Sequence, residues 1–527
     1  MKNAILLLPF VAITLLSCSE RGLEEKDAQT GPYELTHEMI VLGDKMEDPY
    51  TLENMSAALA SVYPTKAGRV DLQATDIYVR FLPKDQEEFR MLLNSGLVLF
   101  DHPIDYQIIK DGDYYHDPEL PEDMITWQYA VVRPDFDFPS RIRYEILDQC
   151  YIADNDPAVR SGGDIDWDLV EREAYRISGN EEFIIPDSKA LSAVARPSGR
   201  ITVYDEDSSD GGIVGVAGVK LICHTFVKFS STYTDADGYY KIDRQFSSKL
   251  RYRIVFQNEK GFAIGFNKVL VPASTSALGM EGPEGLSLTI EPASDRNLYC
   301  RSVVNNACYE YFEICNDADC RISPPPANTR LWLFQLTGAS SAPMLQHGVL
   351  VDDTKLGELM GDYKSIVKMF LPDITLGLKA AGNYSTIYAS AIHELAHASH
   401  FSQVGKTYWN KYVSYILKSF VDTGGRMYGI GEGENAGYCE IGEMWAYYLQ
   451  NRLYWKRYGE ESRLFGTDYW FKPHIFLYLE ERGLDASMIS KALCPEVKDR
   501  ESLRVKLDEL YPEYSKIIDQ AFERYAD

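Results

Sequence analysis

Hydrophobic and polar residues alternate with a period of two over residues 76–81, which predicts a half-buried β-strand. Residues 83–93 then show helical spacing, and the apolar run at 96–100 predicts a second strand. These elements indicate a small N-terminal α/β domain over residues 32–195. No residue pattern in this domain points to a particular chemistry.

Short alternating segments separated by loops rich in Gly, Asp and Ser follow in the next part of the chain. Residues 199–203 and 215–221 alternate, and the pair Asp237-Gly238 is a hairpin signal that leads into a further strand. Together these residues resemble the carboxypeptidase-regulatory-like, or transthyretin-like, β-sandwich. The resemblance implies a β-sandwich domain over residues 196–275 that acts as a spacer or adhesion module.

The last part of the chain, residues 290–527, becomes mainly helical after Ser385. Strands are predicted at 330–336 and 366–370, and an additional helix is predicted near 408–420. The whole pattern therefore predicts a multidomain α+β protein. Its expected parts are the N-terminal α/β domain, the β-sandwich and a mainly helical C-terminal domain.

The composition is that of an ordinary globular protein, because 45% of the 527 residues are apolar and 25% are charged. The formal net charge is −26. An acidic surface without a basic stripe repels phosphate backbones, so no nucleic-acid partner is expected. No internal stretch is long and apolar enough to span a bilayer.

The N-terminus predicts export, because residues 1–17 contain one lysine followed by a short apolar run. The ending Leu-Leu-Ser-Cys resembles a bacterial lipobox, which implies a lipid on Cys18 and a polar tether over residues 18–31. The acidic residues after Cys18 resemble those of outer-membrane lipoproteins, so the expected membrane contact is the lipid alone, facing either the periplasm or the cell surface. The alternative is an ordinary cleaved signal with an incidental cysteine.

Four cysteines lie close together in the sequence, at positions 300, 308, 315 and 320. Export favours disulfide bonds among them, with three possible pairings. A structural zinc site is the alternative, but the cluster contains no Cys-x-x-Cys pair. The remaining cysteines after the signal are scattered and compatible with buried free thiols: Cys150, Cys223, Cys439 and Cys494.

The most informative segment is residues 393–397, which read His-Glu-Leu-Ala-His. Ser385 is the predicted N-cap of the helix that contains them. Residues four apart lie on one helical face, so His393 and His397 can bind the same metal ion. Zinc lowers the pKa of a bound water towards 7, and Glu394 can accept a proton as that water attacks a carbonyl. The pattern predicts a zinc hydrolase site.

A catalytic zinc site needs a third protein ligand and one open position. Residues 443–446 read Glu-Met-Trp-Ala and resemble the Glu-x-aromatic-Ala around the third ligand of gluzincin metallopeptidases. The resemblance implies a zincin-like domain over residues 290–527 in which Glu443 completes the site. Glu440, one turn earlier, is the alternative ligand or a partner of the ligand. The segment between His397 and Glu443 is longer than in thermolysin-like enzymes, which leaves the peptidase family open.

Further side chains in this region are candidates for supporting roles. His400 shares the face of the two histidines and is expected to pack beside them or to support a ligand. Asp422 could serve in an aspartate-type site, but the surrounding pattern is absent. A hydrolase also needs a donor for the developing oxyanion, for which Tyr447 is the first choice, with Tyr438 and His474 as alternatives.

These features predict a lipid-anchored zinc metallopeptidase that hydrolyses peptide bonds of extracellular proteins or glycoproteins. One of the strands predicted at 330–336 and 366–370 could form the sheet edge along which an extended peptide lies. The alternative is a catalytically silent binding or adhesion lipoprotein on a zincin fold. A third possibility is a protease whose N-terminal domain covers the cleft until it is removed.

Overall fold

The structure of the protein is a computed structural model. It describes residues 39–526 with these exceptions: 66, 68–69, 122–123, 161–163, 187–193, 209–211, 266–272, 319, 335–339, 350–371, 380–381, 424–427, 461 and 463–468. The predicted signal (1–17), the lipidated Cys18 with its tether (18–31) and the predicted strand at 366–370 lie outside the described residues.

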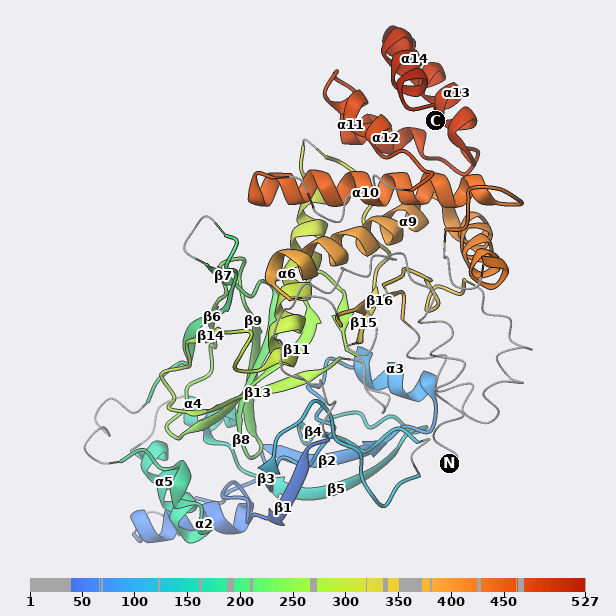
Figure 1. The fold of residues 1–527 in the computed structure, drawn as a ribbon. Helices are drawn as coiled ribbons and strands as arrows, with labels where there is room; N and C mark the ends of the chain where they lie inside the picture. Colours follow the sequence, from blue (N-terminus) through green and yellow to red (C-terminus); the bar gives the residue numbers. More distant parts are fainter. Residues whose placement is uncertain are drawn as a thin grey trace.

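The N-terminal part contains two small antiparallel sheets and three longer helices (Figure 1). One sheet pairs β1 (Val41–Lys45) with β3 (Tyr106–Lys110), and the other has the order β4 (Gln128–Val132), β2 (Asp76–Leu82) and β5 (Arg143–Cys150). The helices are α2 (Leu52–Val62), α3 (Gln86–Asn94) and α5 (Trp167–Ile177). The strand predicted at 76–81 and the helix that follows it are confirmed.

The strand predicted at 96–100 is wrong. Both edges of β2 are already occupied by β4 and β5, so this segment can reach only the outer edge of β4. There Phe100 alone forms a bridge, exchanging two backbone hydrogen bonds with Tyr129 at 2.9 and 2.7 Å. The apolar run therefore packs as irregular chain.

The alternating segments after residue 197 form strands of two different sheets. The smaller sheet joins β10 (Tyr239–Lys241), β6 (Ser198–Tyr204), β14 (Leu288–Ile290) and β7 (Ile213–Gly215). The larger sheet includes β8 (Val219–Thr225), β9 (Lys228–Tyr233), β11 (Leu250–Asn258) and β13 (Thr275–Glu281).

The turn at Asp237-Gly238 does not close a hairpin, contrary to the prediction, because β9 pairs with β8 whereas β10 pairs with β6. The chain changes sheets at this corner. Gly238 has φ of 81°, and a Cβ there would lie 2.1 Å from the carbonyl oxygen of Ile201. The close approach of the two backbones therefore requires glycine at this position.

The larger sheet continues across the predicted boundary between residues 275 and 290. Its order runs β16 (Ile374–Gly377), β15 (Arg330–Phe334), β12 (Ala263–Ile264), β11, β8 and β9. The strands β12, β15 and β16 pair in parallel. One hydrophobic core includes residues from Ile201 to Ala521, and it also takes in the buried face of α6 (Arg296–Asn316). The predicted β-sandwich and C-terminal regions therefore share one sheet and one core.

The C-terminal region is mainly helical, and the fold as a whole is mixed α+β, as predicted (Figure 1). Its helices are α9 (Tyr384–Thr423), α10 (Ala436–Tyr458), α11 (His474–Glu480), α12 (Ala486–Ala492), α13 (Arg500–Leu510) and α14 (Ser515–Arg524). The additional helix predicted near 408–420 is the second half of α9, which follows a break at Gly405. The N-cap is Asn383, whose side chain accepts from the backbone N–H of Thr386, and not the predicted Ser385.

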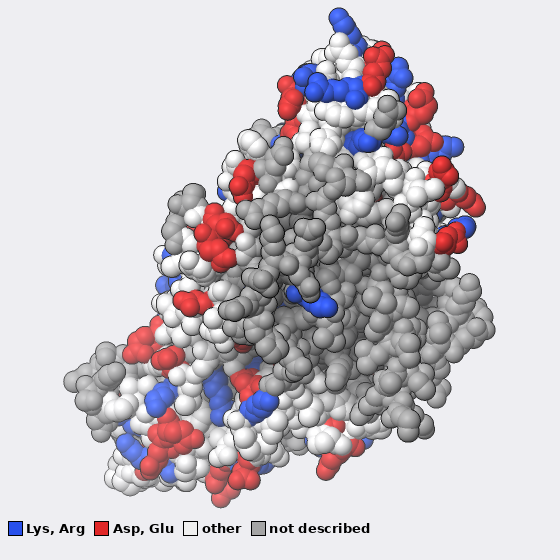
Figure 2. Space-filling view, in the orientation of Figure 1, with Lys and Arg blue, Asp and Glu red and all other residues white. Residues whose placement is uncertain are grey.

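The surface face drawn in Figure 2 carries acidic and basic side chains interspersed over the described N-terminal and C-terminal elements. Among the described residues, we find no helix with the length and hydrophobicity needed to cross a membrane.

The eight cysteines of the described residues are free thiols, and all but Cys494 are buried. The predicted disulfides in the 300–320 cluster are therefore absent from this structure. Cys300, Cys308 and Cys315 all lie on α6, eight and seven residues apart. Such spacings separate Cα atoms by about 10–12 Å along a helix, and a disulfide spans at most about 7 Å. These cysteines instead contribute to the hydrophobic core.

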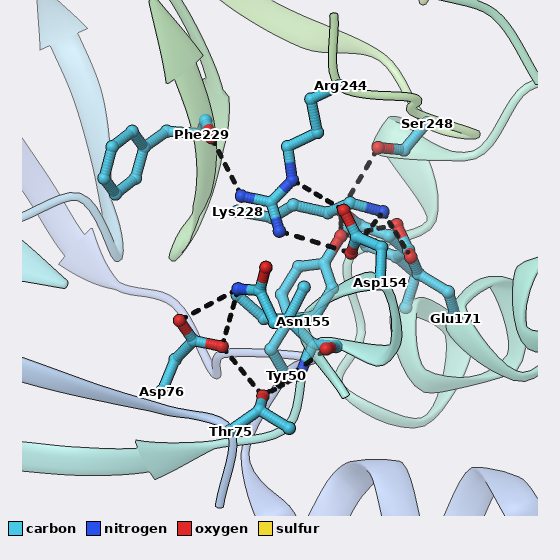
Figure 3. Close-up of polar contacts among 12 residues, drawn as sticks. Tyr50, Thr75, Asp76, Asp154, Asn155, Glu171, Lys228, Phe229, Arg244 and Ser248 are labelled. Atoms are coloured by element: carbon cyan, nitrogen blue, oxygen red, sulfur yellow. Dashed lines mark hydrogen bonds and ion pairs between the residues drawn. The ribbon is translucent and has the colours of Figure 1, made fainter. Parts of the chain in front are cut away.

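A buried polar network joins the N-terminal part to the larger sheet (Figure 3). The ammonium of Lys228, on β9, donates to the carboxylate of Glu171, on α5, at 2.9 Å. The other carboxylate oxygen of Glu171 accepts from the hydroxyl of Tyr50 at 2.5 Å. Nearby, Arg244 binds Asp154 with two hydrogen bonds of 2.8 and 3.2 Å. The N-terminal part is therefore fixed to the sheet through charged groups.

Asp48, just before α2, is a buried carboxyl group of this N-terminal part. Its Oδ1 accepts from the backbone N–H of Tyr50 at 2.8 Å, whereas the buried Oδ2 finds no hydrogen-bond partner within the described part of the chain. Burial raises the pKa of Asp48 to about 8, and the charges of Asp105 and Asp148 add to the rise. An Asp in an unfolded chain titrates near pH 3.9, as a rough reference value.

We therefore expect Asp48 to destabilise the fold as the pH rises. Between about pH 4 and pH 8 the native chain retains a proton that the unfolded chain has released, so the free energy of unfolding falls through this window. The Asp48→Asn variant lacks this dependence and should gain stability relative to the wild type between about pH 5 and pH 8. Urea denaturation of both proteins across this range measures the difference, and a difference that does not change with pH contradicts the prediction.

Candidate metal centre

Two helices that pack side by side, α9 and α10, bring the predicted ligands together (Figure 1). His393 and His397 lie four residues apart on α9, and their Nε2 atoms are 3.2 Å from each other. The carboxylate of Glu443, on α10, lies 3.4 Å from Nε2 of His393 and 3.5 Å from Nε2 of His397. All three side chains are buried. Within the described parts of the chain, this is the group whose composition and spacing suit a metal ion.

The separations within this group fit a tetrahedral ion. Two ligand atoms at 2.0–2.1 Å from a tetrahedral zinc ion lie about 3.3 Å apart. The two Nε2 atoms lie 3.2 Å apart, and each histidine has a different oxygen of Glu443 as its neighbour, Oε2 at 3.4 Å from His393 and Oε1 at 3.5 Å from His397. These distances are close to that value, and both carboxylate oxygens face the histidines. Two imidazole nitrogens and a carboxylate are ligands that zinc accepts, although the same donor set also suits other divalent transition metals. The residues present therefore fit a bound metal, and the donor set alone does not identify it.

A hydrogen bond fixes the orientation of His393. Its Nδ1 lies 2.9 Å from Oε1 of Gln450, whose amide nitrogen donates to Ser462 at 2.9 Å. Because Oε1 can only accept, Nδ1 carries the proton, and the lone pair remains on Nε2, towards the group. This is the outer contact that metal-binding histidines usually make. Sequence reasoning missed Gln450, although its position seven residues after Glu443 places both on one face of α10.

Glu394 is the predicted general base and is also buried. Its Oε2 has no hydrogen-bond partner among the residues that the structure describes. Burial raises the pKa of Glu394 well above its ordinary value, and the negative charge of Glu443 adds to the rise. A buried carboxyl oxygen without a partner costs folding free energy, so such a group indicates a role other than stability.

The pKa values of Glu443 and His397 are shifted in the opposite direction to that of Glu394. Burial alone would raise the pKa of Glu443, but the two adjacent histidines hold it below the usual range of a glutamate. Burial lowers the pKa of His397, and the Glu443 carboxylate opposes this effect. The group therefore combines an ionised carboxylate with an imidazole that burial keeps neutral, which are the protonation states that metal binding requires.

Glu440, the alternative ligand, lies outside the group. Its Oε1 pairs with the guanidinium of Arg500 at 2.5 Å. Burial raises its pKa to about 6, although Arg500 opposes the rise. The structure thus brings Glu443, and not Glu440, to the two histidines.

The other candidates lie at different distances from the centre. The ring of Tyr447 packs edge-on against His393, with centroids 4.5 Å apart. His400 packs between the rings of Tyr408 and Trp409 rather than in the group, and burial lowers its pKa to about 3. Asp422 is exposed and pairs with a lysine one turn earlier, which excludes it as a buried third ligand.

The two remaining oxyanion candidates have other partners. The hydroxyl of Tyr438 accepts from Lys411 at 2.9 Å, and its ring packs against Tyr408. The imidazole of His474 stacks on Tyr525 near the C-terminus. Of the three tyrosine and histidine candidates, Tyr447 is the one that contacts a predicted ligand.

The strand predicted at 330–336 corresponds to β15 and is an internal strand, because β12 and β16 flank it. The described edge of the sheet beside α9 is β16. An isolated antiparallel bridge joins Ser341 to Thr375 on this edge. The strand predicted at 330–336 is therefore not a sheet edge that could receive a peptide, and part of the described edge, β16, is paired within the chain.

Comparison with known proteins gives no match to a family model, a curated protein or a solved structure. The support for this candidate metal centre is therefore its residues and their geometry.

Proposed function

We propose that the protein is a zinc-dependent metallopeptidase of the gluzincin type. The observation that carries this proposal is the convergence of His393, His397 and Glu443 at separations suited to one tetrahedral ion. The segment His-Glu-x-x-His, with Glu394 adjacent to the ligands, is the reason for choosing zinc and hydrolysis among the metals and reactions that the donor set permits.

Each residue at the site would have a separate role in the reaction. His393, His397 and Glu443 would hold the ion, and Gln450 keeps His393 in the required tautomer. Bound there, zinc would supply Lewis acidity for attack on a peptide carbonyl. Glu394 would take the proton of the attacking water on its carboxylate and return it to the leaving amine. The phenol of Tyr447 would serve as the donor to the developing oxyanion.

The proposal includes the remaining sequence features. The N-terminal segment would direct the chain to the outer membrane through a lipid on Cys18, and the expected substrate is an extracellular protein or glycoprotein. The segments at 196–275 would act as a carboxypeptidase-regulatory-like module that supports the peptidase. Because this region shares a sheet with β15 and β16, it would act as part of the catalytic body rather than as a detachable spacer.

The second candidate function is a catalytically silent binding lipoprotein that keeps a metal for stability. The observation that favours it is the burial of the whole group, because His393 is 4% exposed and Glu443 is 0% exposed. Structural zinc sites are closed, whereas catalytic sites keep an open position. Against it stands Glu394, a buried carboxyl group that a purely structural site does not need.

Metal analysis of a soluble form, residues 19–527, tests the site directly. We expect about one zinc ion per chain in the wild type and in Glu440→Ala, and a large loss in His393→Ala and Glu443→Ala, because only these two remove a ligand. Mass spectrometry of the metal content provides the measurement, and circular dichroism checks that each variant is folded. A wild-type chain that takes up no zinc after metal is added back would contradict the proposal.

A further inference from the structure

The break in α9 at Gly405 turns the second half of that helix back towards the proposed metal ligands His393, His397 and Glu443. His397 and Tyr412 are fifteen residues apart, which in a continuous helix is about 22 Å along the axis. Yet the hydroxyl of Tyr412 lies 3.5 Å from Nε2 of His397. Gly405 makes this possible with φ of 78° and ψ of 175°, a left-handed backbone conformation that favours glycine.

Tyr412 reaches the group through a short hydrogen bond to a predicted ligand. Its hydroxyl donates to Oε1 of Glu443 at 2.6 Å, and both groups are buried. The same oxygen lies 3.5 Å from Nε2 of His397, and the other oxygen of this carboxylate, Oε2, lies 3.4 Å from Nε2 of His393. A hydrogen bond from a hydroxyl to an ionised carboxylate in a buried site is short and strong, so it fixes the rotation of the carboxylate.

The ring of Tyr412 is itself held on two sides. Trp409 stacks on it, with centroids 4.4 Å apart and planes 25° apart, and the indole N–H donates to the carbonyl of Ala342 at 2.9 Å. The Cδ2–Cε2 edge of the ring also lies against Gly442 of α10, where an added Cβ would come within 3.0 Å of Cε2. The absence of a side chain at Gly442 therefore lets the ring approach α10 closely enough to reach the neighbouring Glu443.

We infer that Tyr412 is a positioning residue for the metal ligand Glu443. Its hydroxyl holds Oε1 and keeps the carboxylate turned towards the two histidines, as Gln450 does for the imidazole of His393. This inference rests on the proposed metal site and adds to it a residue from beyond the Gly405 break. It also gives the break a function, because an unbroken helix would carry Tyr412 away from the site.

The test is zinc affinity, measured on residues 19–527 by competition with a chromophoric chelator. Removing a hydrogen-bond partner of a ligand typically weakens metal binding about 10–100-fold, and we expect this loss in Tyr412→Phe. The visible absorption of the Co²⁺-loaded protein should change as well, because it reports the geometry of the ligands. Gly442→Ala, which crowds the ring without removing the hydroxyl, should weaken zinc binding by a smaller factor.

The matched control is Tyr415→Phe. Tyr415 lies on the same half of α9, and its buried hydroxyl donates to the carbonyl of Tyr428 at 3.0 Å, away from the ligands. We expect wild-type affinity and a wild-type Co²⁺ spectrum in this control. If Tyr412→Phe and Gly442→Ala both bind zinc like the wild type, the inference is overturned and the metal site stands. If the wild type itself binds no zinc, the proposed function fails and the inference fails with it.

Discussion

Glu394→Gln is expected to lower peptide hydrolysis by a factor of about 10²–10⁴ while the zinc content stays at the wild-type level. The amide keeps the size of the side chain but cannot accept a proton. The variant is also expected to be at least as stable as the wild type, because it removes a buried carboxyl group whose Oε2 has no partner among the described side chains and backbone groups. Cleavage of a broad peptide library, followed by mass spectrometry, measures the activity, and thermal denaturation measures the stability.

The control for this variant is Glu440→Gln, which also removes a buried carboxylate from the helical region but leaves the metal group intact. It is expected to retain zinc and hydrolysis. Full activity in zinc-loaded Glu394→Gln would exclude this residue as the general base. A zinc-loaded wild type that cleaves no peptide in the library would instead favour the silent binding protein.

Removing the ammonium of Lys228 is expected to cause the largest loss of stability among the substitutions considered. Lys228 and Glu171 are 5% and 7% exposed, so Lys228→Met leaves a carboxylate that is buried and without its cation (Figure 3). Breaking one side of a buried ion pair costs about 3–5 kcal/mol of unfolding free energy. Urea denaturation followed by circular dichroism measures this loss.

A double variant separates the effect of the unpaired Glu171 carboxylate from that of the lost packing of the Lys228 side chain. In Lys228→Met combined with Glu171→Gln no unpaired charge remains, and the new amide oxygen can still accept from Tyr50, so most of the loss should be recovered. Lys241→Met on the exposed strand β10 is the surface control, with an expected change within about 0.5 kcal/mol. Equal losses in the single and double variants would show that packing, and not charge, holds this interface.

The group formed by His393, His397 and Glu443 could be predicted from the sequence because short local patterns identify its members. The spacing of His393 and His397 needs only the geometry of one helix. The short motif at residues 443–446 also favoured Glu443 over Glu440, and the structure places Glu443 beside the histidines. Tyr412 could not be predicted, because its place at the site depends on a single left-handed residue between it and the histidines. A lone tyrosine carries no motif, and the chain contains 36 of them.

Long-range pairing explains most of the errors in the fold. The strand at 76–81 was found by its period, but the apolar run at 96–100 could not reveal that both edges of β2 were already occupied. The Asp-Gly turn was recognised, whereas the sheet that each flanking strand would join was not. The disulfide prediction followed from export alone, and the helix over residues 296–316 places three of the four cysteines too far apart to pair.

The continuous sheet also sets the order in which the chain can fold while it is being made. The strands β8, β9 and β11 are complete by Asn258, but β12 must wait for β15 and β16, which end at Gly377. At about 5–20 residues per second, that delay lasts roughly 6–24 s. By Glu281 the strand β13 covers β11 over residues 250–255, but the edge formed by β12 stays unfinished until β15 is made. Such an edge is the surface through which nascent chains associate with one another. The chain is therefore most prone to associate with other copies during its synthesis, and a chaperone that covers strand edges would have its largest effect at that stage.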